Sequence, residues 1–112
     1  MLATGGKRAV QAQIIRMTRR IVRGFDPERI ILFGSYARGD AGPDSDVDLL
    51  VVMSLTGSKL DKAVEIGVAL HDIPVSKDII VTRPEDFEWR KDIIGTIEHP
   101  AFREGKVLYE RK

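Results

Sequence analysis

The sequence contains no cysteine, which excludes disulfide bonds and thiolate metal sites. It has no uninterrupted apolar run approaching the ~18 residues that a membrane-spanning helix needs. Its first residues also lack the apolar stretch that is typical of a secretion signal. From these absences we expect a cytoplasmic protein that neither enters a membrane nor is exported.

An excess of charge of one sign is also lacking, because 18 basic residues are balanced by 17 acidic ones and the net charge is +1. Proteins that grip long nucleic acids are usually strongly basic, so we expect no strong nucleic-acid binding. With 112 residues and 43% hydrophobic composition, the chain can form one core. We expect one domain over residues 1–112, with an N-terminal helix at about 7–25 and a core at about 25–110.

Hydrophobic periodicity predicts two amphipathic helices in the first two thirds of the chain. Residues 7–25 carry apolar side chains at three- and four-residue spacing, and we interpret the arginines between them as a solvated face. Residues 59–72 show the same spacing. The apolar or small residues of this second repeat are Leu60, Ala63, Val64, Gly67 and Val68, and His71 is its last member.

Four short apolar runs have the length and composition of strands. They are 29–33, 47–53, 77–82 and 106–110. A helix is predicted to begin at Pro84, with Gly95 dividing the segment into two short helices or one broken helix. We expect Phe87 and Trp89 of this segment to pack in the core.

Two aspartates at the mouth of the second predicted strand suggest a metal site. Asp46 and Asp48 flank Val47, and because side chains alternate across a strand, both carboxylates project from one face. Buried without a cation, they would repel each other at a cost of several kcal/mol. All-oxygen ligands suit Mg²⁺ or Mn²⁺ better than zinc.

Phosphoryl transfer with two metal ions ~4 Å apart generally requires a further carboxylate. Asp78 is our candidate, because it enters an otherwise apolar strand that we place beside the strand of Asp46. Without a partner or an ion, an aspartate is unusual at the start of such a strand. We therefore expect Asp46, Asp48 and Asp78 to lie together.

The turn after the first strand suggests a phosphate site. Gly34 allows backbone N–H groups to approach phosphate oxygens, and Ser35 adds a hydroxyl donor. Arg38 could pair with a triphosphate, or it could brace the turn through Asp40 or Asp44, and the sequence favours neither interpretation.

Three other interpretations compete for this stretch. A calcium-binding loop is excluded because Leu49 and Leu55 stand where that loop requires glycine and glutamate. A Walker phosphate loop is excluded because no Gly-Lys-Ser/Thr follows Gly34. A solvated acidic turn would explain a lone Asp-x-Asp, but the complete arrangement is much more specific.

The spacing of these motifs resembles that of a known family. Gly34-Ser35, ten intervening residues and then Asp46-Val47-Asp48 is similar to the signature of the DNA polymerase beta-like nucleotidyltransferase superfamily. The fuller run GSYARGDAGPDSDVDLLVV resembles its minimal nucleotidyltransferase branch. The later segments KDIIVTRPEDFE and AFREGKVLYE extend the resemblance over about residues 25–110.

The resemblance implies an α/β (α+β) nucleotidyltransferase fold, in which helices flank a short mixed β-sheet of about four strands. It implies that Gly34 and Ser35 hold the nucleotide phosphates and that Asp46 and Asp48 bind Mg²⁺, with two ions expected. Asp78 corresponds to the family's third acidic position, which helps to activate the acceptor hydroxyl. The implied reaction is transfer of a nucleoside monophosphate, AMP from ATP in our expectation.

Members of the minimal branch are often encoded beside an all-helical HEPN toxin of the ribonuclease type, which they adenylylate as antitoxins. The resemblance therefore implies a HEPN partner, modified on a tyrosine or another hydroxyl. This agrees with the small size of the chain, which leaves little room for an acceptor-binding domain of its own. Two alternatives stay open, namely an antitoxin that only binds its partner and an enzyme that nucleotidylates a small molecule of the aminoglycoside or lincosamide type. Homo-oligomerisation also stays open.

Overall fold

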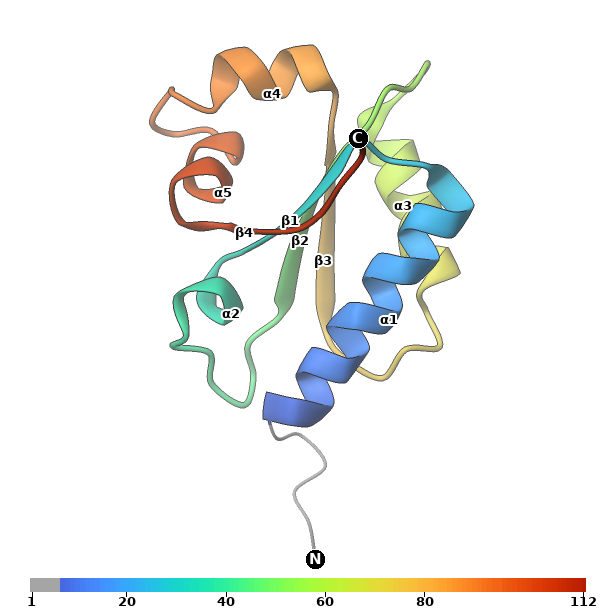
Figure 1. Cartoon of the computed structure of the whole chain (residues 1–112), viewed down its shortest axis with the longest axis vertical. Coiled ribbons are helices and arrows are strands. Elements are labelled where there is room, and N and C mark those ends of the chain that lie inside the picture. Colours follow the sequence, from blue (N-terminus) through green and yellow to red (C-terminus); the bar gives the residue numbers. More distant parts are fainter. Residues whose placement is uncertain (1–6) are drawn as a thin grey trace, which may run out of the picture.

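The computed structural model describes residues 7–112, which form five helices and four strands (Figure 1). In chain order the elements are α1 (Lys7–Phe25), β1 (Arg29–Phe33), α2 (Ser35–Arg38), β2 (Val47–Val52), α3 (Lys59–Ala69), β3 (Lys77–Thr82), α4 (Pro84–Arg90), α5 (Glu98–Glu104) and β4 (Lys106–Glu110). All four predicted strands are confirmed. The predicted second helix ends three residues early, at Ala69.

The strands form one mixed sheet in the order β3-β2-β1-β4. β1 runs antiparallel to both of its neighbours, and β2 runs parallel to β3. The expected short mixed sheet flanked by helices is therefore confirmed. The expected neighbourhood of the second and third strands is confirmed as well, and it decides which side chains share one end of the sheet.

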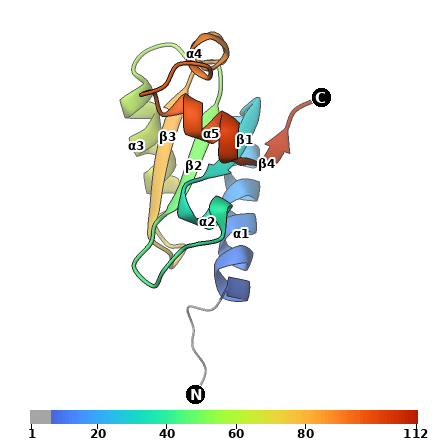
Figure 2. The same ribbon diagram turned by 90° about the vertical axis from the view of Figure 1, so that its left-hand side faces the viewer.

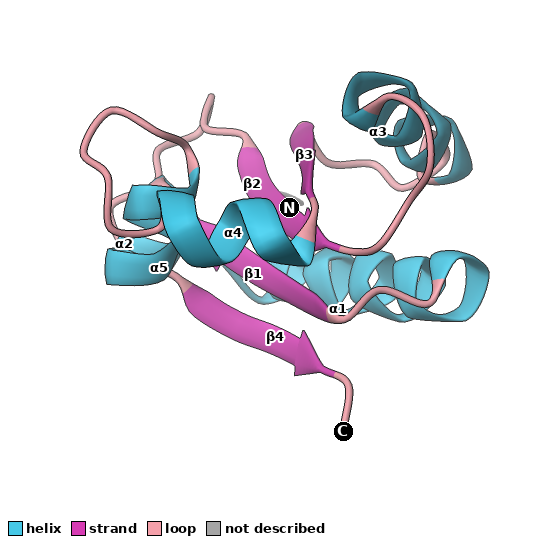
Figure 3. Ribbon diagram, turned by 90° about the horizontal axis from the view of Figure 1, so that it is seen from above, coloured by secondary structure: helices cyan, strands magenta, loops and turns pink. Residues whose placement is uncertain are grey.

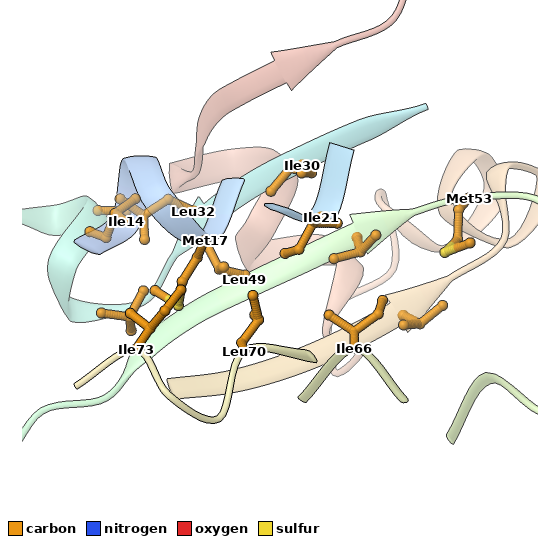
Figure 4. Close-up of a cluster of buried hydrophobic side chains, with 14 of the residues drawn as sticks. Ile14, Met17, Ile21, Ile30, Leu32, Leu49, Met53, Ile66, Leu70 and Ile73 are labelled. Atoms are coloured by element: carbon orange, nitrogen blue, oxygen red, sulfur yellow. The ribbon is translucent and has the colours of Figure 1, made fainter. Parts of the chain in front are cut away.

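One face of the sheet is covered by the two longer helices, α1 and α3 (Figure 1). The apolar stripe of α1 contributes Ile14, Met17 and Ile21 to the larger core cluster, where they meet alternate residues of β1 and β2 (Figure 4). Met17 and Ile21 are fully buried. This packing explains why the arginines of α1 face outward, because the three- and four-residue spacing leaves the opposite side of the helix to polar groups.

The other face is covered by α4 and α5, as the view from above shows (Figure 3), whereas α2 packs Ala37 into the larger cluster. The core of this other face is smaller and includes Ile31, Leu50, Phe87 and Ala101. The Thr82 hydroxyl donates a hydrogen bond of 2.7 Å to the carboxylate of Glu98, and both residues are buried. This bond supplies the partner that a buried carboxylate requires.

Helix α3 has two apolar faces, and only one of them packs against the sheet. Ile66 and the following Leu70 are fully buried, whereas the predicted repeat leaves Leu60, Val64 and Val68 more than half exposed. His71 lies past the end of the helix and is exposed. The periodicity therefore located the helix correctly but not its buried side, since residues four apart share a face whether or not that face is covered.

The segment from 84 to 104 is two short helices, as predicted, with Gly95 in the connection at φ +103°. Phe87 is buried as expected, but the expectation for Trp89 is wrong, because Trp89 is 59% exposed. The indole lies beside the guanidinium of Arg90, whose central carbon is 5.3 Å from the ring centroid. Among the helices of residues 7–112, none is long and apolar enough to cross a membrane.

Candidate functional site

Three chain segments meet at one end of the sheet, where β1 ends and where β2 and β3 begin (Figure 2). The register places Phe33 of β1 opposite Asp48 of β2, and Asp48 opposite Asp78 of β3. Side chains paired on neighbouring strands project from the same face, about 5 Å apart at the backbone. The structure therefore brings the carboxylates of Asp48 and Asp78 to one side of the sheet.

Asp46 joins this pair from the residue immediately before β2. It is exposed, as is Asp78, while Asp48 is half-buried between them. Burial raises the pKa of the Asp48 carboxyl, and the negative charges of Asp78 and Asp46 raise it further. The positive charge of Arg38 opposes this shift. Asp46, Asp78 and Arg38 are therefore all close enough to Asp48 for their charges to change the pKa of its carboxyl.

Gly34 is the residue that connects β1 to α2, and its backbone has φ +74°. A Cβ atom at this position would collide with the carboxylate of Asp48. Glycine is needed here for two independent reasons, the left-handed backbone and the missing side chain. The chain thus passes directly against the acidic pair, and Ser35 begins the single turn of α2 beside it.

The turn of α2 is closed by backbone hydrogen bonds. The Gly34 carbonyl accepts from the N–H groups of Ala37 and Arg38, each at 3.0 Å. The turn ends at Gly39, which has φ +89°. Downstream, the backbone N–H of Gly42 donates to the Ser45 hydroxyl at 2.9 Å. The loop that delivers Asp46 is therefore fixed by its own short-range bonds.

Arg38 braces the turn. Its guanidinium lies 3.3 Å from a carboxylate oxygen of Asp40 and 3.7 Å from one of Glu104, at the end of α5. These two carboxylates raise the pKa of Arg38, with Asp40 the larger cause. Of the two braces considered from the sequence, Asp40 is the one that the structure contains. The same side chain still acts on Asp48 through its charge.

Sequence reasoning missed Glu104, which ties α5 to the turn of α2. No signal in the sequence could have indicated this contact, because the two residues are far apart in the chain and exposed glutamates at helix ends are common. It also missed a cleft of about 870 Å³ that is lined in part by the 39–45 loop. Tyr36, Ser45 and the first turns of α1 line this cleft, and none of the three aspartates does.

The chemistry of the acidic group suits a hard divalent cation. No side chain among residues 8–112 gives a hydrogen bond or a salt bridge to Asp46, Asp48 or Asp78. Their mutual repulsion is expressed in the raised pKa of Asp48, and a cation would relieve it. Within the same residues, however, no three acidic or histidine groups are close enough to form a ready-made metal site. The metal assignment therefore stays a prediction.

Comparison with known proteins identifies the family. The model of the nucleotidyltransferase domain family matches residues 15–101, which include β1, the Gly34 turn, the three aspartates, α4 and the first half of α5. The chain belongs to the nucleotidyltransferase domain family. The expected family is thus confirmed, and with it the enzyme class.

Relatives of known sequence or structure agree with this family. A protein of Methanocaldococcus jannaschii, provisionally named protein adenylyltransferase MJ0604, is 31% identical over 90 residues, covering 73% of this chain and 78% of the relative. A crystal structure from Sulfolobus solfataricus, provisionally described as a nucleotidyltransferase, covers 95% of this chain and 90% of its own at 21% identity and a TM-score of 0.62.

A toxin–antitoxin structure with AMP-PNP also has a similar fold. It covers 91% of this chain and 74% of its own, at 20% identity and a TM-score of 0.51. At 20% identity this likeness shows a shared fold and does not identify the substrate or the partner of this chain.

Proposed function

We propose that this nucleotidyltransferase domain transfers AMP from ATP to a tyrosine or another hydroxyl of a partner protein, a HEPN-family toxin, and so acts as an antitoxin. The observation that carries the proposal is the side-by-side placement of Asp48 and Asp78 next to the Gly34 turn. The name of the archaeal relative, protein adenylyltransferase, supports a protein acceptor. The toxin–antitoxin neighbour with AMP-PNP supports ATP as the donor and a toxin as the partner. The HEPN class of the proposed partner follows from the sequence resemblance.

Each residue has a role that follows from its position. The Gly34 backbone and the Ser35 hydroxyl bind the β- and γ-phosphates of ATP, because this turn passes directly against the Asp48 carboxylate. Asp46 and Asp48 would hold two Mg²⁺ ions, with Asp78 completing the set. When bound, these ions neutralise the phosphate charge that builds up during transfer.

In this proposal, Asp78 accepts the proton of the acceptor hydroxyl. It is exposed at the start of the edge strand β3, so a protein surface can approach it, whereas Asp48 is half-buried behind it. The acceptor oxygen then bonds to the α-phosphorus of ATP, the bond between that phosphorus and the bridging oxygen breaks, and pyrophosphate leaves. The small chain supplies the donor side of this reaction, and the partner supplies the acceptor side.

The test combines purified chain, a HEPN-family protein from the same genome, Mg²⁺ and ATP labelled on the α-phosphate. The expected result is label on the partner and a gain of one or more AMP units in its intact mass. We expect the Asp46→Asn/Asp48→Asn variant to lose this transfer completely while remaining folded. Asp44→Asn is the matched control, because Asp44 is exposed in the same loop and takes no part in the site.

Two results would contradict the proposal. Undiminished labelling by the double variant would remove Asp46 and Asp48 from the site. Tight binding of the partner with no change in its mass would favour an antitoxin that acts by occlusion.

A further inference from the structure

Helix α1 carries positive charge that the catalytic proposal does not use. Its basic residues are Lys7, Arg8, Arg16, Arg19, Arg20 and Arg23, and the helix contains no acidic residue. Arg20 is paired with Asp72, and Arg16 donates a hydrogen bond to Gln13. No carboxylate among residues 7–112 lies within ion-pair distance of Arg19 or Arg23. These two exposed guanidinium groups therefore form a positive edge along the helix.

The same helix forms one wall of an apolar groove, whose other wall is the edge strand β4. The groove has a volume of about 520 Å³. Its apolar lining comes from Ile14, Ile15 and Val22 of α1 and from Leu108 and Tyr109 of β4, and the remaining lining residues are Thr18, Arg19 and Arg23. Ile15 is 51% exposed, although it belongs to a helix whose opposite face is fully buried.

We infer that this groove, which we call the α1–β4 groove, binds an acidic amphipathic helix of a partner protein. A mostly aliphatic floor with guanidinium groups at its rim complements a helix that has apolar residues on one side and carboxylates beside them. From Ile14 to Arg23 the groove runs along about ten residues of α1, or ~15 Å, which matches two to three turns of a docked helix.

Two other occupants fit the groove less well. RNA could stack on Tyr109 and on the arginines, but it would leave the four aliphatic side chains of the groove without an apolar partner. An added strand would pair with the free edge of β4 in the plane of the sheet, whereas the groove is lined by side chains between that strand and α1. The groove is also separate from the acidic group, since none of its lining residues belongs to the catalytic proposal.

The probe is a fluorescein-labelled 18-residue peptide with leucine at helical i, i+3, i+4 and i+7 positions and glutamate between them. A second peptide of the same sequence, with glutamine in place of every glutamate, tests the charge. Fluorescence anisotropy with the full chain is expected to show saturable binding of the acidic peptide that weakens with added salt, and at least roughly tenfold weaker binding of the glutamine peptide.

Variants place the binding on the groove. We expect Arg19→Gln/Arg23→Gln to weaken binding roughly tenfold and Ile15→Ala to weaken it severalfold, since these side chains are exposed and their loss leaves the core intact. Arg103→Gln, an exposed arginine on α5, is the matched control and should leave binding unchanged. Thermal unfolding of each variant confirms that the fold is retained.

Four results would overturn the inference. These are no binding of either peptide, equal loss of binding in the Arg103 control, tighter arginine-dependent binding of a single-stranded RNA of 20 nucleotides than of the peptide, and a concentration-dependent dimer that the Ile15 variant abolishes. None of them bears on the transfer of label from ATP, so the inference and the catalytic proposal fail separately.

Discussion

The two faces of the sheet differ in how completely helices cover them. Among the described residues, fifteen buried side chains form the cluster under α1 and α3, whereas six form the cluster under α4 and α5. Buried apolar area is the main favourable contribution to folding, so most of the stability lies on the first face. The second face is left open where β2 and β3 begin, and that is where Asp48 and Asp78 lie.

This difference shows how a small chain can combine a stable fold with an exposed acidic group. The α1/α3 face fixes the strands, and the strands fix the register that pairs Asp48 with Asp78. The open face then leaves Asp46 and Asp78 exposed, as the proposed transfer from ATP to a second protein requires. Changes on the first face should therefore act on stability, and changes at the open end should act on chemistry at little cost in stability.

The largest expected effect is on the well-packed face, with Ile66→Ala. Ile66 is fully buried on the inner side of α3. Removal of such a side chain costs about 2–5 kcal/mol through lost burial and the cavity left behind. Val64→Ala, on the exposed side of the same helix, should change stability by no more than about 0.5 kcal/mol. Urea unfolding of both variants measures the difference. Equal destabilisation would mean that the two sides of α3 are covered alike.

The next effect is on the thinner face, with Thr82→Val. This change removes the hydroxyl that donates to Glu98 and leaves a buried carboxylate without its partner, at a cost of about 1–3 kcal/mol. Thr56→Val, in an exposed loop, is the control. If the free energy of unfolding in urea is unchanged in Thr82→Val, then water molecules replace the hydroxyl as hydrogen-bond donors to Glu98, and this side of the sheet is less tightly packed than the structure indicates.

A smaller effect is expected at the acidic group, where Asp48→Asn should increase the stability of the fold. The pKa of Asp48 is raised above its ordinary value of 3.8, first by burial and then by Asp78 and Asp46. The folded protein therefore binds this proton more tightly than the unfolded chain does. The resulting stability is present below the ordinary pKa and is lost as the pH rises through the raised value. At pH 7 without Mg²⁺, the ionised carboxylate thus destabilises the fold.

We expect Asp48→Asn to raise the melting temperature at about pH 7 by a few degrees at most, since 1 kcal/mol corresponds to about 4–8 °C in a domain of this size. The gain should disappear at about pH 3, where the wild-type carboxyl is largely protonated in both states. Added Mg²⁺ should stabilise the wild type and not the variant. A melting temperature lowered by the substitution at pH 7 would show that Asp48 already has a compensating partner.

The sequence predicted the elements of this fold well because helices and strands have different hydrophobic periods, and each period is visible over a few residues. It could not show which face of α3 is buried, because Leu60, Val64 and Val68 have the same spacing as a core stripe. It also could not show that β4 pairs with β1, or that Arg38 meets Glu104, since both contacts join distant parts of the chain.

The candidate site could be predicted to a similar extent. Asp48 and Asp78 were expected to be neighbours, and the register puts them opposite each other. The need for glycine at position 34 was expected from phosphate binding, but the structure adds a cause that the sequence does not contain. A side chain there would collide with the Asp48 carboxylate. Contacts of this kind depend on how the strand ends are aligned, and alignment is a property of the whole sheet.

The smallest expected effect is that of Arg38→Ala at the open end. The side chain and both of its carboxylate partners are about half exposed, and such surface pairs contribute about 0–1 kcal/mol. We therefore expect a loss of stability below about 1 kcal/mol in urea unfolding. The charge of Arg38 lowers the pKa of Asp48, so its removal should raise that pKa further, and NMR titration of the Asp48 carboxyl carbon measures this shift. Arg103→Ala, elsewhere on the surface, should leave the titration unchanged. An unaltered Asp48 titration in Arg38→Ala would mean that Arg38 serves the turn alone and that the acidic group is electrostatically independent of it.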